Sequence, residues 1–248
     1  MKTGGITNYI HIWDSKIKSG NSLGVYQTID ANDNFSLLPG EGSYSSGTNQ
    51  IVESGQSFFV QTDNTGGEVT INEDAKISGT NGNLGLRPST PATSLAKLRS
   101  KLISINGSNI SVADANIVKF QDAFSNNVDG NDALKFSSAG ENFGILRNSK
   151  NLVIEGRQPV SVADTIYYKM WNMQPHAYQL QFEPTNLGGS GLTAVLEDKY
   201  LQKSTIVDLT ITSTVNFTVD ANAGSSAADR FKIVFKQLAP LPVSILSI

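Results

Sequence analysis

Apolar and polar residues alternate in short runs along most of the chain, which is the pattern of half-buried β-strands. The clearest run is "AYQLQFEP" at 177–184, where Tyr178, Leu180 and Phe182 alternate with glutamines. Successive side chains of a strand point to opposite faces of the sheet. We therefore expect this segment to bury its three large apolar side chains and to turn its glutamines outward.

A second alternating run, "TIYYKMW" at 165–171, carries large side chains on both faces. One face is wholly apolar or aromatic, and the other face carries Tyr167, Lys169 and Trp171. A face that mixes aromatic rings with a lysine suits either a core edge or an exposed binding surface. The sequence leaves both interpretations open.

Similar runs, bounded by Gly, Asn and Ser, predict strands throughout the chain. They lie at 9–13, 24–29, 55–62, 68–73, 101–120 (strand, turn, strand), 143–156 (a hairpin), 192–200, 205–210, 215–219 and 230–235. The glycines of "DNTGG" predict a hairpin turn between 62 and 68. Helical periodicity is confined to "SLAKLRSKL" at 94–102, which is long enough for one or two turns. The pattern predicts an all-β fold, an antiparallel β-sandwich of jelly-roll or Ig-like type, built from two packed or tandem β units.

The composition of "SGTNGNLGLRPSTPATS" divides the chain, because Gly, Ser, Thr and Pro dominate it. We expect an N-terminal β unit at 1–80, either complete or the end of an upstream domain, a linker or long loop at 81–97, a β-sandwich domain at 98–238, and the start of a proline-containing, truncated tether at 239–248.

Composition and charge limit the chemistry. The chain has 248 residues, a formal charge of −3, no cysteine and two histidines. Nothing in it resembles the basic stripe of a nucleic-acid-binding protein, and no apolar run approaches the length of a bilayer span. We therefore expect no nucleic-acid partner and no membrane insertion. The absence of cysteine excludes disulfides and thiolate metal sites, and the two histidines leave few possible Ser/His/Asp triads.

The acidic stretch "NNVDGNDALKF" at 126–136 is the main candidate for a metal site. Asp129, Asn131 and Asp132 supply the oxygen atoms that calcium prefers. The EF-hand spacing fails, because a loop counted from Asn127 has an aspartate at its sixth position and a serine at its twelfth.

The other interpretation of this acidic stretch is a turn whose Asp and Asn side chains cap backbone groups. A catalytic pair is least favoured, since glycosidase carboxylates face each other across a cleft. No cofactor is required, and calcium is the one that the stretch suggests.

Six further polar positions are expected to have no role in chemistry. Asp30 and Asp33 occupy a second acidic turn. His11 lies between aromatic strand positions and should be packed, whereas His176 follows a proline in a predicted loop and should be solvated. The pair "ED" at 197–198 could meet Lys199 or Arg230, and exposed charges of this kind contribute little stability.

Several stretches resemble the large secreted or surface proteins of Bacteroidetes that the type nine secretion system exports. These stretches are "YIHIWD", "GVYQTI", "IVESGQSFFVQT", "GGEVTINEDAK", "NNVDGNDALKF", "LEDKYLQKSTIVDL" and "VNFTVDANAGSSAADRFKIVF". In such proteins a proline-containing tether like "LAPLPVSIL" precedes a C-terminal sorting domain, which is missing here. The resemblance implies an extracellular or cell-surface location, and contact with the secretion machinery through that domain. It implies no shared active site.

These observations favour a non-catalytic extracellular β-sandwich module of an adhesin-like protein, with a structural or binding role. The alternative is a carbohydrate-binding module attached to a secreted enzyme, in which Trp171, Tyr167 and Lys169 contact a polysaccharide or another cell-surface ligand. A glycoside hydrolase or lyase is the least supported reading, because no spacing shows two acidic residues converging.

Overall fold

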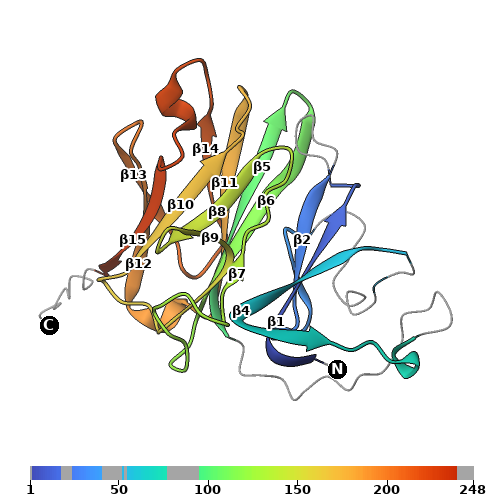
Figure 1. Cartoon of the computed structure of the whole chain (residues 1–248). Coiled ribbons are helices and arrows are strands. Elements are labelled where there is room, and N and C mark those ends of the chain that lie inside the picture. The colour runs from blue at the N-terminus through green and yellow to red at the C-terminus, as the bar shows by residue number, and fades with distance from the viewer. Residues whose placement is uncertain (1, 18–23, 41–51, 53–54, 77–94, 239–248) are drawn as a thin grey trace, which may run out of the picture.

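The computed structural model describes residues 2–17, 24–40, 52, 55–76 and 95–238. Within them the fold is all-β, with two sheets packed against each other (Figure 1). Three short 3₁₀ turns are the helical segments of the described residues, at η1 (Glu73–Ala75), η2 (Gly188–Ser190) and η3 (Ala223–Ser226). None of the helical segments described is long and apolar enough to span a bilayer.

The small sheet has four antiparallel strands in the order β3-β2-β1-β4. Its strands are β1 (Lys2–Asp14), β2 (Val25–Asp30), β3 (Ser36–Leu38) and β4 (Phe58–Val69). The two long strands pair with each other, and β2 and β3 extend the sheet on the other side of β1. The small sheet therefore comes entirely from the predicted N-terminal β unit.

The large sheet follows the order β13-β12-β15-β10-β8-β9-β6-β5-β11-β14, with β7 paired to β9. Its strands are β5 (Ala96–Asn106), β6 (Asn109–Phe120), β7 (Ala133–Leu134), β8 (Asn142–Arg147), β9 (Lys150–Arg157), β10 (Thr165–Trp171), β11 (Ala177–Thr185), β12 (Leu192–Asp198), β13 (Lys203–Val207), β14 (Ser213–Thr218) and β15 (Phe231–Gln237). All pairs are antiparallel except β6 with β9.

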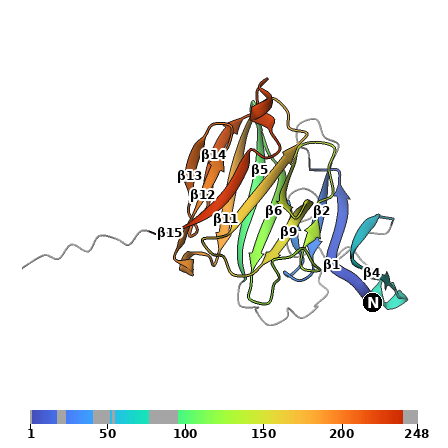
Figure 2. The same ribbon diagram turned by 60° about the vertical axis from the view of Figure 1, so that its left-hand side comes forward.

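The large sheet curls until its two edges approach each other. Its edge strands, β13 and β14, are consecutive in the sequence and are joined by a five-residue turn at 208–212. In that turn the Ser213 hydroxyl accepts a hydrogen bond from the Asp208 amide at 2.9 Å. The result is nearly a barrel (Figure 2), and its interior is filled by the main hydrophobic core.

The alternating runs behave as the sequence predicts. In β11, Tyr178, Leu180 and Phe182 are buried and belong to the main core, whereas the intervening glutamines are half-buried. The hairpin of β8 and β9 turns at Asn148 and Ser149, which have φ values of 45° and 62°. Such left-handed positions match the twist of a two-residue hairpin.

Two local predictions are wrong. The segment 63–67 is not a hairpin turn, because 58–69 forms the single strand β4, which pairs along β1 with register shifts. Asp63 Oδ1 accepts hydrogen bonds from the Thr65 amide and hydroxyl, so the extra residues fold locally as a bulge. The described part of the segment 94–102 is not helical, since β5 begins at Ala96 and pairs with both β6 and β11.

The predicted division of the chain into units at 1–80, 81–97, 98–238 and 239–248 stays a prediction. Strand β5 includes the last two residues of the predicted linker at 81–97. Residues 77–94 and the predicted tether at 239–248 lie outside the described residues.

Candidate functional site

The predicted ligand residues lie on the outer face of the large sheet. Tyr167, Lys169 and Trp171 alternate along β10 with three buried residues, as the sequence indicates. The Tyr167 side chain is 52% exposed. Lys169 and Trp171 are half-buried, and Lys169 Nζ lies 5.8 Å from the centroid of the Trp171 ring. The three residues therefore share a face, but only Tyr167 is clearly exposed.

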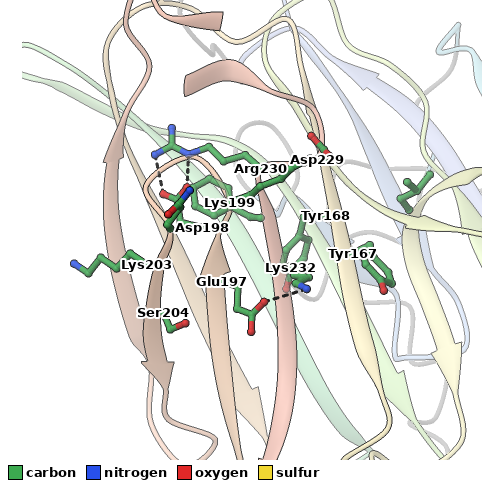
Figure 3. A pocket seen from close by; sticks show the side chains of 13 residues that line it. Tyr167, Tyr168, Glu197, Asp198, Lys199, Lys203, Ser204, Asp229, Arg230 and Lys232 are labelled. Atoms are coloured by element: carbon green, nitrogen blue, oxygen red, sulfur yellow. Dashed lines mark hydrogen bonds and ion pairs between the residues drawn. The ribbon is translucent and has the colours of Figure 1, made fainter. Parts of the chain in front are cut away.

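A groove of about 660 Å³ opens beside Tyr167 (Figure 3). It crosses β10, β15, β12 and β13, which are neighbours in the sheet. Side chains on these strands and on the adjoining turns supply its polar groups, namely Glu197, Lys199, Gln202, Lys203, Ser204, Asp229 and Lys232. Lys169 and Trp171 do not line it. The structure thus shifts the centre of the site from Trp171 to Tyr167.

Trp171 lies beside Gly144 of the neighbouring strand β8. Its own partner in the pairing is Asn142, two pairs along from Gly144, which pairs with Lys169. A β-carbon built on Gly144 would lie 3.6 Å from the Trp171 ring, which is an ordinary van der Waals distance, so the indole packs over this position. The ring is consequently a half-buried neighbour of the groove.

The acidic groups of the groove are paired with lysines. Glu197 Oε2 lies 3.0 Å from Lys232 Nζ, and Asp229 forms an ion pair with Lys199. The hydrogen bond from Lys199 lowers the pKa of the Asp229 carboxyl. Lys203 also lines the groove, and it forms no ion pair with any described residue. The open groove therefore carries an excess of positive charge.

A buried arginine, Arg230, is among the residues that line the groove. Arg230 donates to both carboxylate oxygens of Asp198, at 3.0 and 2.8 Å. It also donates to the backbone carbonyls of Thr218 and Ser225, and its guanidinium lies over three aromatic rings. The prediction that the acidic pair at 197–198 is an exposed edge charge is wrong for Asp198, because that residue is buried.

The acidic stretch at 126–136 forms a closed turn. Asp129 Oδ1 accepts from the Asn131 amide at 2.8 Å. Asp132 Oδ2 accepts from the Asp129 amide at 2.7 Å, and its Oδ1 accepts from the Gly156 amide at 3.0 Å. Three carboxylate oxygens are thus already bonded to backbone amides. This arrangement supports the turn interpretation, while calcium binding stays a prediction.

Burial governs the charge of this turn. Asp132 is buried, which raises the pKa of its carboxyl to about 6 despite the two amide hydrogen bonds. Among the described residues no group of three or more His, Asp or Glu side chains is placed to hold a metal ion. Asp129, Asn131 and Asp132 therefore offer at most a site that would need additional ligands such as water or backbone carbonyls.

The same turn also forms hydrogen bonds with the small sheet. The Tyr9 hydroxyl of β1 donates to the Asn131 carbonyl at 2.6 Å. The Gln61 amide of β4 donates to the Asp132 carbonyl at 2.9 Å and accepts from the Leu134 amide at 2.8 Å. Around these bonds, an apolar cluster joins the sheets: Tyr9, Leu38, Ala115, Ile117, Ala133, Val153 and Ile154. The stretch is a docking surface between two sheets.

The second acidic turn also joins the sheets, which the sequence did not reveal. Asp30 forms a buried ion pair with Lys119 of β6. Asp33 Oδ2 lies 2.8 Å from Lys97 Nζ of β5. Burial alone would raise the pKa of Asp33, but the hydrogen bond from Lys97 and the charge of Lys119 lower it. These aspartates cap a turn and also anchor it.

The two histidines occupy different environments. His11 is buried, as predicted, with Nδ1 2.9 Å from Thr28 Oγ1 and its ring stacked on Phe136. Burial and the charge of Lys135 lower its pKa to about 4. His176 is not solvated as predicted, because its ring packs at a tilt on that of Tyr178, with the centroids 4.2 Å apart, and is only partly exposed.

A serine and a glutamate lie near His176, but their geometry is not that of a hydrolytic triad. Ser104 Oγ lies 2.8 Å from His176 Nε2, and Glu141 Oε1 lies 3.8 Å from the same nitrogen. In a triad, the acid orients the imidazole through its other nitrogen. Ser104 and Glu141 are both buried, so neither is open to a substrate.

Sequence reasoning missed the charged residues of the groove. Lys232 alternates with apolar residues in "RFKIVFK", so its outward direction could have been predicted. Its pairing with Glu197 and its place beside Tyr167 depend on strand order, which joins β12, β15 and β10 from distant parts of the chain. No local pattern contains that information.

Comparisons with other proteins give a family but no described activity. No curated protein and no solved structure matches the chain. One family model, described as a domain of unknown function (DUF8693), matches residues 2–235 and so includes both sheets. The chain therefore belongs to the DUF8693 family.

Proposed function

We propose that the chain is a non-catalytic β-sandwich module of a large secreted, adhesin-like surface protein, and that its large sheet binds a polysaccharide. The location and export by the type nine secretion system rest on the sequence resemblance. The observation that carries the binding role is the half-exposed ring of Tyr167 at the edge of a groove of about 660 Å³.

An exposed ring on a rigid sheet is suited to sugar binding. Aromatic rings pack on the apolar faces of pyranoses, while nearby polar groups bond to hydroxyls. Tyr167 is held by backbone pairing to both neighbours, with Lys232 on β15 and Leu146 on β8. Its position is therefore set before any ligand arrives, which reduces the entropy lost on binding.

The groove lacks the features that a glycosidase acid requires. Such an acid must be protonated before reaction, so its pKa has to be raised. The hydrogen bond from Lys199 instead lowers the pKa of Asp229, and Glu197 is held by Lys232. These pairings support a non-catalytic role, and a hydrolase or lyase remains the least supported alternative.

Binding to immobilised and soluble polysaccharides tests the proposal. We expect saturable binding that falls about tenfold or more in Tyr167→Ala, because a large buried contact is worth about 1.5–3 kcal/mol. Tyr167→Phe keeps the ring and should retain most of the affinity. A folded protein that binds no glycan in a broad screen would overturn the binding role, and glycan cleavage that survives purification would overturn the non-catalytic one.

The contact between the sheets favours a second role as a spacer. Two aspartates of the small sheet are bonded to lysines of the large sheet, and Gln61 bridges two backbone groups. Such an interface fixes the relative position of the two sheets. Spacing and binding are compatible in one module, and only the binding role depends on Tyr167.

A further inference from the structure

We infer that the groove beside Tyr167 selects anionic polysaccharides, that is, chains bearing carboxylate or sulfate groups. This inference rests on the proposed binding function and adds the chemical class of the ligand. It follows from which charges along the outer face are already paired and which remain free to meet a ligand.

The carboxylates that line the groove are neutralised. Glu197 is paired with Lys232, Asp229 with Lys199, and the buried Asp198 with Arg230. Each of these pairs has no net charge. An incoming anionic group would therefore meet no unpaired carboxylate on the groove lining that the structure describes.

Two lysines supply the remaining charge. Lys203 is an exposed residue that lines the groove, and Lys169 stands on the same strand face as Tyr167. Neither forms an ion pair within the part of the chain that the structure describes. Lys169 lies near the Trp171 ring, and this contact leaves its charge intact. A ligand lying along the groove from Tyr167 would thus meet Lys203, and Lys169 stands two residues further along β10 from Tyr167.

The strand order sets the length of ligand that fits. Lys203, Glu197, Lys232 and Tyr167 belong to β13, β12, β15 and β10, four neighbours in the sheet. Three spacings of about 4.8 Å separate the outer two strands, so the groove extends roughly 14 Å along the sheet. Figure 3 shows Tyr167 and Lys203 toward opposite sides, with Glu197 and Lys232 between them. This span suits a short oligosaccharide with several sugar units.

Titration calorimetry with three oligosaccharides of equal length tests the inference. The probes are an oligogalacturonate for carboxylate, a sulfated dextran oligosaccharide for sulfate, and a maltooligosaccharide as the neutral chain. We expect at least one anionic probe to bind more tightly than the neutral one, and its affinity to fall as salt is raised. The two anionic arms show which group is preferred.

Matched variants locate the charge. Lys203→Gln should weaken the anionic probe about two- to fivefold, the range of an exposed charge pair, and leave neutral binding unchanged. Lys203→Arg should retain the affinity. Lys150→Gln, which removes an exposed lysine on the β8–β9 hairpin that does not line the groove, should change nothing. Glu197→Gln frees Lys232 and should strengthen anionic binding by a similar factor.

The outcomes separate this inference from the proposed function. Equal binding of neutral and anionic probes, lost in Tyr167→Ala, would overturn the charge selection and leave the binding role. Absence of any glycan binding would overturn both. A single-stranded DNA oligonucleotide that binds more tightly than every glycan would also overturn the inference, since it carries anionic groups and stacking bases.

Discussion

The small and large sheets reach stability by different routes. The large sheet curls around a continuous core, and one of its buried ion pairs, Arg230 with Asp198, lies entirely within it. The small sheet has one face in the apolar contact with its neighbour, and its buried Asp30 is neutralised by Lys119 of the large sheet. Lys119 also depends on Asp30, but other buried ion pairs of the large sheet need no residue of the small one. Among the described residues, Asp30 forms its ion pair only with Lys119. We therefore expect loss of the large sheet to release the small one, and the reverse dependence to be weaker.

The two tryptophans allow the sheets to be followed separately. Trp13 lies in β1 of the small sheet and Trp171 in β10 of the large sheet. Variants with Phe at one of the two positions leave a single fluorescent reporter in the other sheet. Guanidinium unfolding of these variants then reports the stability of each sheet separately.

The largest expected effect follows from Arg230→Met. The substitution leaves Asp198 buried without its partner and removes two bonds to backbone carbonyls, so unfolding should become easier by about 5 kcal/mol. Both reporters should shift together. Lys199→Met is the control, because it breaks an exposed pair in the same region and should change stability little. A shift of Trp171 alone would contradict the dependence of the small sheet on the large one.

Lys119→Met tests whether the small sheet can unfold while the large sheet stays folded. It leaves the buried Asp30 unpaired and should cost about 3–4 kcal/mol, felt mainly by the small sheet. The Trp13 reporter should unfold at lower denaturant than the Trp171 reporter, and hydrogen exchange should rise in β1 and β2. The double variant Lys119→Met, Asp30→Asn should recover much of the loss. Equal shifts of both reporters in the single variant would show that the two sheets unfold as one unit.

His11 makes the small sheet sensitive to pH. Its pKa is about 4 in the folded protein, below the ordinary value of 6.5. The unfolded chain therefore binds the proton first as pH falls, so this residue's contribution is complete above about pH 6.5 and is lost on the way to pH 4. The full loss is on the order of 3 kcal/mol. His11→Gln should remove this part of the pH dependence, as seen by comparing the two stability curves. Parallel curves for the two proteins would count against the assignment.

Asp132 changes the stability of the fold with pH in the opposite direction to His11, within part of the same pH range. Its folded-state pKa of about 6 lies above the ordinary value of 3.8. The folded protein therefore binds this proton first, so the unfavourable burial of the charge is relieved as pH falls from about 6 toward 3.8. For this reason the His11 effect is measured as a difference between variant and parent, in which the Asp132 contribution cancels.

The smallest expected effect is that of calcium. Because Asp129 and Asp132 already accept hydrogen bonds from backbone amides, the turn interpretation expects the same melting temperature in calcium and in EDTA. A cation that binds only the native state would raise the melting temperature with concentration. Such a rise, lost in Asp129→Asn, would replace the turn interpretation with a cation site at the junction of the sheets.

Much of the fold follows from local pattern, and the failures share a cause. Strands such as β10 and β11 have the predicted bounds within a residue, because a half-buried strand alternates visibly. The hairpin predicted at 63–67 is instead a bulge, since β1 is long enough to pair with both flanking segments. Local turn residues favour a bend, but they do not specify whether the chain reverses or continues. That choice is made by the partner strand.

The candidate site also has a part that the sequence predicts and a part that only the structure shows. The sequence places Tyr167, Lys169 and Trp171 on one face, and the structure has them there. Only the structure shows that Tyr167 is the exposed member, and that a groove with paired carboxylates and an unpaired Lys203 lies beside it. These features need β12, β13 and β15, whose sequence positions are distant from β10.

The sequence by itself determined that the chain is all-β, which faces its strands bury, and that cysteine chemistry is excluded. The tertiary structure alone decided what the acidic turns do. Asp30 and Asp132 look like solvated turn residues, yet both are buried where two sheets meet. Alternation can be recognised in the local sequence because the side chains of a strand repeat every two residues. The partner of a buried charge cannot be recognised in this way, because it lies on a distant strand that only the packing of the sheets brings close.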